Sequence, residues 1–412
     1  MLNSPPPELW LEILHHLPLT DLQAIYAVST LFHDIVQSRL FQDVKLHLGP
    51  DKPAMGELRE RLAFLCTPPV SFHVRKFTFF GRIRGFSHIY SSLSLDSANE
   101  WVVVILQAIP SFVNLRTLWL DSWTNPQIGF SRLGLETLTN LEELRIVGSS
   151  FNSSQTPPIS KIRVKRLYLQ FSHFLDYSAG KSRSFLPVMN PHTLSLLDLT
   201  FDSNVHTRWL VDGDPVFANL RQLNLTCSAV SCVQLHQISA RFPSVRRLVV
   251  DAFLLGTPTS AVVTQIDTFC GPCSFLPLVL PGTGCSELVI TDSTPAYLAE
   301  TLAVAGRTPS VTSLALSFSL HQIATWTSPR EVFSLLPNVS ELRLRITGSE
   351  KVPDNVTHQT YPGILARILS TARDLQSVEI TGALPPFIST PHKLEDSLRG
   401  ALPHLRDIRV CG

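Results

Sequence analysis

The 412-residue chain has few charged residues and no long apolar run. Lys, Arg, Asp and Glu make up only 16% of it, whereas about 25% is usual in soluble domains, so we expect partners to cover part of its surface. The formal net charge of +1 gives no electrostatic footprint for nucleic acid or anionic lipid. The densest apolar run, residues 101–106, stops before Pro110 and is far too short to span a bilayer.

The chain also lacks the patterns typical of secreted proteins and of common enzymes. Its seven cysteines are an odd number spread over a long sequence, which favours a reducing compartment over a disulfide framework. No basic segment followed by an apolar run and a small-residue cleavage site begins the chain. We therefore expect an intracellular location, cytoplasmic and/or nuclear. No GxSxG, P-loop, GxGxxG after a strand or HExxH occurs, so we expect no catalytic group and no cofactor.

The first forty residues predict three short helices. Leu9, Ile13, Leu14 and Leu17 form an apolar stripe at helical spacing, and Pro18 ends that helix. Residues 20–23 have the Thr-x-x-Gln form of a capping box, which predicts a second helix starting there. Ser29 or Thr30 can cap a third helix. So few residues cannot bury this much apolar surface, so the rest of the chain or a partner must cover it.

This N-terminal stretch resembles an F-box over roughly residues 3–45. The matching features are Pro-Pro-Glu-Leu at 6–9, Ile-Leu at 13–14, Leu-Pro at 17–18, Asp-Leu at 21–22 and Ala-Val-Ser at 27–29. The resemblance implies a helical module that docks on the Skp-type adaptor of cullin–RING ubiquitin ligases. It implies that eight residues hold the module together or contact the adaptor: Pro7, Leu9, Ile13, Leu14, Leu17, Pro18, Leu22 and Val28. The alternative is a plain helical cap on the rest of the chain.

The remainder of the chain repeats one pattern, x-L-x-x-L-x-L. Its first apolar positions are Val74, Leu115, Leu141, Val164, Leu194, Leu220, Val245, Cys285, Val311, Val339, Leu375 and Leu405. Most steps between them lie in or near the roughly 20–29 residues of leucine-rich repeats. Between them, Thr294-Pro295, Ser328-Pro329 and Thr390-Pro391 each predict a capped helix opened by proline.

Such units of helix, turn and short strand stack into a right-handed α/β solenoid with a parallel sheet on one face. The segments resemble irregular leucine-rich repeats, although the Asn or Cys expected after the third leucine is mostly absent. We predict a helical module over residues 1–48, a linker helix within 49–73, and a solenoid of about twelve repeats over 74–412. The Ser- and Pro-rich residues 81–99 and 148–160, and residues 172–190, read as loops.

The strand residues between the leucines should face the open side of the sheet, because side chains alternate along a strand. We predict that a protein target binds this concave face. The candidate residues are Trp119, Asp121, Arg145, Tyr168, Asn224, Arg343 and Arg345.

Cys270-Gly-Pro-Cys273 is identical to the active-site tetrapeptide of thioredoxins and suggests a rival function in thiol–disulfide exchange. The context disfavours it, because Pro277, Pro281 and Gly282 would interrupt the long helix that must follow. A turn within the repeat over residues 250–285 is the simpler interpretation. A zinc site made of Cys270, Cys273 and Cys285 lacks a nearby fourth ligand of suitable spacing, which leaves Cys227 and Cys232 as candidates only if the fold brings them close.

The F-box resemblance, taken with the repeats behind it, implies a non-catalytic substrate-recognition subunit of a Skp–cullin–F-box ubiquitin ligase. The adaptor would bind the N-terminal helices, and an unidentified target protein would bind the solenoid. Two alternatives stay open. One is a scaffold that uses the same adaptor contact outside ubiquitination, and the other is the redox protein suggested by Cys270 and Cys273.

Overall fold

The computed structural model describes residues 7–47, 55–80, 104–121, 124–129, 134–148, 150–152, 162–170, 173–176, 181–183, 186–201, 215–256, 265–282, 284–347, 360–382 and 391–411. The chain divides into two compact units. Unit 1 comprises Met1–Thr200 and Gly213–Pro215, and unit 2 comprises Phe201–Asp212 and Val216–Gly412. Within the described residues, no helix has the length and apolar character needed to cross a bilayer.

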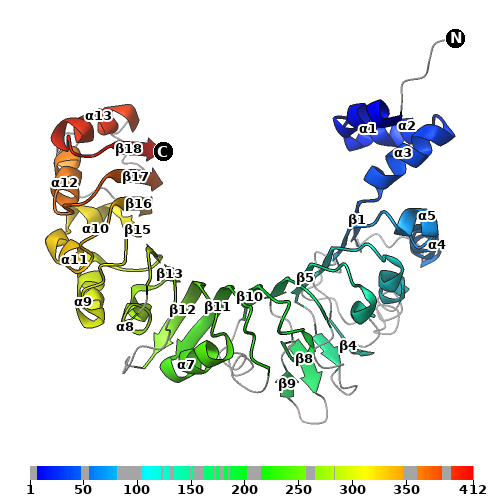
Figure 1. Cartoon of the computed structure of the whole chain (residues 1–412), viewed down its shortest axis with the longest axis horizontal. Helices are drawn as coiled ribbons and strands as arrows, with labels where there is room; N and C mark the ends of the chain where they lie inside the picture. The colour runs from blue at the N-terminus through cyan, green and yellow to red at the C-terminus, as the bar shows by residue number, and fades with distance from the viewer. Residues whose placement is uncertain are drawn as a thin grey trace, which may run out of the picture. The chain divides into compact units, whose positions relative to one another are not determined.

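Unit 1 begins with the three predicted helices, α1 (Pro7–His15), α2 (Leu19–Tyr26) and α3 (Thr30–Leu40) (Figure 1). Their core is formed by three buried side chains, Leu14, Leu22 and Val36, with partly buried aromatic and aliphatic residues packed around it. The predicted capping box at residues 20–23 is wrong. The helix already begins at Leu19, after Pro18, and no side chain caps it.

The cap of α3 is as predicted, because the backbone N–H of Phe32 donates to Ser29 Oγ at 3.3 Å. The chain then enters a parallel sheet directly. Its strands in unit 1 follow the order β1 (Asp43–His47), β2 (Lys76–Phe80), β3 (Thr117–Asp121), β5 (Glu143–Val147), β7 (Arg166–Gln170) and β10 (Leu196–Thr200). Between β1 and β2 lie the helices α4 (Met55–Leu65) and α5 (Pro68–Ser71), so that the segment 49–73, in which one linker helix was predicted, contains two.

A second, smaller sheet in unit 1 was not predicted. It contains β4 (Thr124–Gly129), β6 (Ser150–Asn152), β8 (His173–Asp176) and β9 (Lys181–Arg183) in that order. The loops expected over 148–160 and 172–190 therefore contain short strands, and the expected loop over 81–99 lies outside the described residues. The unit also contains helical residues 104–108 and the short 3-10 helices η1 (Ile109–Ser111), η3 (Leu135–Thr137) and η4 (Leu186–Val188).

Unit 2 contains the strands β11 (Gln222–Ser231), β12 (Arg247–Leu255), β13 (Thr268–Gly271), β14 (Glu287–Ile290), β15 (Ser313–Ser319), β16 (Glu341–Thr347), β17 (Ser377–Gly382) and β18 (Asp407–Cys411), all parallel and in this order. Its helices are α7 (Cys232–Arg241), α8 (Leu276–Val279), α9 (Pro295–Ala305), α10 (Leu320–Ala324), α11 (Pro329–Leu335), α12 (Thr360–Leu369) and α13 (Pro391–Ala401), with the 3-10 helix η6 (Cys273–Phe275). In Figure 1, α9, α11, α12 and α13 lie along one side of these strands.

The leucine positions of each repeat build the core between strands and helices. Leu314 on β15 pairs in register with Leu342 on β16, which pairs with Val378 and then Ile408. All four side chains are buried, and each buried aliphatic side chain of this size contributes about 1.5–3 kcal/mol. The residues between them face the opposite side, which we call the strand face of each unit.

All twelve predicted repeat positions precede strands of these sheets, and two further strands were missed. Phe41-x-x-Val44-x-Leu46 leads into β1, and Ile266-x-x-Phe269-x-Gly271 leads into β13. The second escaped because glycine stands at the third apolar position. A Cβ there would lie 2.7 Å from the carbonyl oxygen of Val250, so the tight strand spacing requires glycine. The long step from Val245 to Cys285 is therefore two repeats.

Candidate functional site

The N-terminal helices carry an exposed apolar surface on the side away from their core. Leu9 and Ile13, one helical turn apart on α1, are 53% and 50% exposed, and Val28 before α3 is 69% exposed. Leu19 and Leu31 are also exposed. We call these five residues the apolar helix surface. Several exposed large apolar side chains in one small helical module are typical of a protein-binding site.

The eight residues predicted for adaptor binding divide into two groups. Leu14 and Leu22 are buried in the core, and Leu17 packs partly buried against it, so these three hold the helices together. Leu9, Ile13, Val28 and Pro18 are exposed. Pro7 is the first residue of α1, and its side chain lies outside the described residues.

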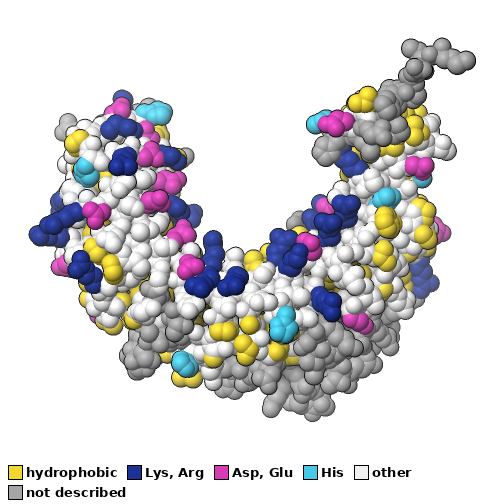
Figure 2. All heavy atoms as spheres, in the orientation of Figure 1, with side chains coloured by type: hydrophobic (Ala, Val, Ile, Leu, Met, Phe, Trp, Pro, Cys, Tyr) yellow, Lys and Arg dark blue, Asp and Glu magenta, His cyan; other side chains and the backbone are white. Residues whose placement is uncertain are grey.

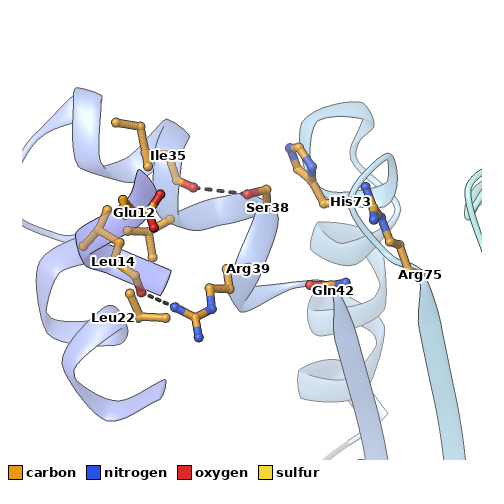
Figure 3. Close-up of a pocket in the computed structure, with 10 residues that line it drawn as sticks. Glu12, Leu14, Leu22, Ile35, Ser38, Arg39, Gln42, His73 and Arg75 are labelled. Carbon is orange, nitrogen blue, oxygen red and sulfur yellow. Dashed lines mark hydrogen bonds between the residues drawn. The ribbon is translucent and has the colours of Figure 1, made fainter. Parts of the chain in front are cut away.

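Arg39 joins the ends of two helices, which the sequence did not predict (Figure 3). Its guanidinium, in the last turn of α3, donates to the backbone carbonyl of Leu14 near the end of α1. Terminal carbonyls of a helix have no partner within the helix, and a cation there also complements the helix dipole. Arg39 therefore fixes α1 on α3. It lines a pocket that Glu12, Ser38, His73 and Arg75 share.

The helical module is bonded to the sheet of unit 1 through the residue before β1. The backbone carbonyl of Gln42 accepts hydrogen bonds from the N–H groups of Arg75 at 3.0 Å and Lys76 at 2.9 Å. Gln42 also lines the pocket in Figure 3. Only two residues thus separate the last helix of the module from the first strand of the sheet.

On the strand face of unit 1, three predicted target-binding residues stack across neighbouring strands. Trp119, Arg145 and Tyr168 are consecutive partners in register. The guanidinium of Arg145 lies 4.4 Å from the Trp119 ring centroid and 5.8 Å from that of Tyr168. Burial, and secondarily the charge of Glu143, raises the pKa of Tyr168. The side chains are held in place by contact with one another, as suits an interface anchor.

Two aromatic residues that sequence reasoning missed extend this row. Phe80 lies edge-on to Trp119 with ring centroids 5.4 Å apart, and His47 stacks on Phe80 at 4.4 Å. Asp121, the fourth candidate in unit 1, is the register partner of Phe80. The signal for His47 was available, because it occupies the same strand position as Phe80, but β1 was not recognised as a strand.

On the strand face of unit 2, Arg343 is surrounded by carboxylates. It lies 3.5 Å from Glu287, 3.9 Å from Glu379 and 4.0 Å from Glu341. Figure 2 shows acidic and basic side chains together along this side of the unit. Arg345 follows on the same strand. Asn224 lies on β11, where its Oδ1 accepts from Gln222 Nε2 at 3.1 Å. Unlike the unit 1 residues, these candidates do not form one cluster.

The Cys270–Cys273 segment is part of a repeat, and its surroundings disfavour the redox alternative. Cys270 lies on β13, and buried Cys273 begins η6. The helix that follows, α8, has only four residues. Burial raises the pKa of both thiols, which disfavours the thiolate needed for exchange. In the described part of the chain, no three His, Cys, Asp or Glu side chains group as metal ligands would.

Comparison with known proteins identifies the N-terminal helices. A family model for the F-box domain matches residues 6–42. None of the curated proteins compared with the chain matches it. An internalin (inlF) from Listeria monocytogenes shares 11% identity at a TM-score of 0.37, covering 95% of this chain and 93% of its own. A Bacteroides fragilis protein shares 11% identity at a TM-score of 0.30, covering 77% and 72%. At these scores neither likeness supports a conclusion.

Proposed function

Because residues 6–42 form an F-box domain followed by a leucine-rich-repeat-like solenoid, we propose that this chain is the substrate-recognition subunit of a Skp–cullin–F-box ubiquitin ligase. The F-box binds a Skp-type adaptor, and the strand faces bind a protein target. The family match is the observation that carries the proposal, and the exposed apolar helix surface supports it. The chain itself supplies no catalytic group in this scheme.

The adaptor contact follows from the apolar helix surface. Leu9, Ile13 and Val28 are at least half exposed while the core beneath them is already filled by Leu14 and Leu22. Covering each exposed side chain with a partner would contribute up to about 1.5–3 kcal/mol. Because Arg39 fixes α1 on α3, the adaptor meets a surface that is already ordered, which lowers the entropic cost of binding.

Target binding is supported by the residue types on the strand faces. Trp, Tyr and Arg are the side chains enriched at the energetic centres of protein interfaces, and all three occur in the Trp119–Arg145–Tyr168 stack. Tethering a target beside a ubiquitin-charged enzyme raises the local concentration of its lysines, so that transfer becomes effectively intramolecular.

The adaptor contact can be tested with purified proteins. We expect the full chain to bind a Skp-type adaptor and the double variant Leu9→Asp/Ile13→Asp to bind at least about 100-fold more weakly, since each tenfold corresponds to about 1.4 kcal/mol. Val304→Asp, a change at a 67% exposed position on α9, is the matched control and should bind as the wild type does. Absence of adaptor binding by the wild type, or unchanged affinity in the double variant, would overturn the proposal.

A ubiquitin-ligase receptor and a scaffold that acts outside ubiquitination can be distinguished by whether the proteins bound to the chain are degraded. Affinity purification with and without residues 1–45, under proteasome inhibition, should lose the ligase subunits on deletion and retain candidate targets. For a receptor, a retained target accumulates in cells lacking this chain. For a scaffold, its abundance does not change.

A further inference from the structure

Strand β12 extends well beyond its neighbour β13. On one side it pairs with β11 as far as Leu255, the partner of Ser231. On the other side only Arg247, Leu248 and Val249 pair with β13, which has four residues against nine in β12. Among the described residues, the stretch Asp251–Leu255 therefore pairs with β11 on one edge and with no strand on the other, which we call its open edge; η6, which follows β13, lies near β12.

The backbone groups on that open edge can be identified from the bonds nearby. The carbonyl of Arg246 accepts from Thr268 N at 3.0 Å on the β13 side, whereas Arg247 N donates to Arg221 O at 3.0 Å on the β11 side. In a β-strand, each residue directs both its N–H and its C=O to one side, and the next residue directs both of its groups to the other side. Ala252 and Leu254 therefore direct two donors and two acceptors to the open side, where no partner occurs within the described chain.

The side chains along this edge lack the usual protection. Soluble proteins block open strand edges with lysines, prolines, bulges or very short strands. Here Phe253 and Leu255 project from one face of the strand and are 73% and 50% exposed, and Asp251 is the one charged residue in the stretch. A strand with unmet hydrogen-bonding groups and bare apolar side chains is a template for another strand.

We propose that the open edge of β12 at Asp251–Leu255 captures an extended segment of a partner protein as an added strand. The backbone of Ala252 and Leu254 supplies the hydrogen bonds. Phe253 and Leu255 pack against alternate apolar side chains of the segment, and Asp251 favours one with a Lys or Arg beside it. That the partner is a ubiquitination target rests on the proposed function, whereas strand capture does not.

The test uses the full chain and the peptide Lys-Thr-Val-Thr-Val-Thr-Val-Lys, with amide exchange measured at single residues. We expect the peptide to slow exchange at Ala252 and Leu254 by about tenfold or more and to leave Phe253 and Leu255, already paired to β11, unchanged. The same peptide N-methylated throughout should protect neither amide. Replacing both lysines by glutamate should weaken binding because of Asp251.

Substitutions at exposed positions separate this edge from the rest of the surface. Phe253→Lys/Leu255→Lys should weaken peptide binding by about tenfold, and Val304→Lys on α9 should not. Three outcomes would overturn the proposal. The first is protection of the Ala252 and Leu254 amides from exchange in the free chain. The second is protection that appears only as the protein concentration rises, which would mean pairing between two copies. The third is peptide binding that is unchanged by the double substitution. Adaptor binding by the same variants should be unchanged, so failure here is distinguishable from failure of the proposed function.

Discussion

Arg343 on β16 reaches Glu287 on β14 at 3.5 Å, across the whole width of the intervening strand β15. The strand between them makes this possible, because its residues in register with the pair are Ser313 and Ala315. Because these side chains are small, they do not obstruct the Arg343 guanidinium where it crosses β15 to reach Glu287. The contact ties three repeats together with one side chain.

We expect Arg343→Ala to lower the free energy of unfolding by about 0.5–1 kcal/mol, because three carboxylates then repel one another without a cation. The effect should shrink between about 0.05 and 0.5 M NaCl as the charges are screened. Urea unfolding at both salt concentrations measures it, with Arg345→Ala as the control on the same strand. An equal loss in both variants would contradict the role given to the carboxylate cluster.

A double-mutant cycle should detect the contact between Trp119 and Arg145. We expect Trp119→Leu and Arg145→Gln to show a coupling energy of about 0.5–1 kcal/mol in urea unfolding, because either change alone removes the cation–π contact. Additive effects would mean that the stacking seen at 4.4 Å contributes nothing to stability.

Stability should fall at alkaline pH through the buried thiol of Cys285. Burial raises its pKa to about 11 from the ordinary 9.0. Between these values the unfolded chain has lost the thiol proton while the folded chain keeps it, so the free energy of unfolding decreases as pH rises. The stabilisation is fully present below about pH 9 and is lost through about pH 11, amounting to roughly 3 kcal/mol. Comparison of wild type and Cys285→Ala from pH 8 to 11 isolates it, and parallel pH profiles would refute it.

Gly382 at the end of β17 should not tolerate a side chain. Its φ is +100°, and an added Cβ would collide with the backbone carbonyl of Ile346 on β16. We expect Gly382→Ala to destabilise unit 2 by about 2 kcal/mol or more. The control is Gly400→Ala in α13, which meets nothing within 4 Å and should stabilise the helix by up to about 1 kcal/mol. Thermal unfolding compares the two, and similar melting temperatures would contradict the expectation.

The repeats could be predicted because their information is local. Each x-L-x-x-L-x-L segment carries its own inward and outward residues, so twelve strands were found without knowing their neighbours. Gly271 broke that pattern at β13, since its identity is set by the backbone of the adjacent strand. The small sheet of β4, β6, β8 and β9 was missed because its segments carry no such repeat.

The candidate site was predictable to a similar extent. Equivalent strand positions correctly placed Trp119, Arg145 and Tyr168 on one face, and register then brought them into contact. The contact of Arg39 with the Leu14 carbonyl joins residues 25 apart in sequence, and no local pattern indicates it. The open edge of β12 depends on two strands of unequal length, which the repeat pattern treats as equal.

The bond pattern at Gln42 bears on how a ligase built on this chain would work. Only Phe41 and Gln42 lie between α3 and β1, and the Gln42 carbonyl is held by two N–H groups. An adaptor on the N-terminal helices would thus be attached to unit 1 through a short, hydrogen-bonded connection and not through a long flexible linker. The lysines of a target on that unit would be selected by orientation instead of by diffusive search, so that a short flexible insertion at this junction should broaden the set of modified lysines.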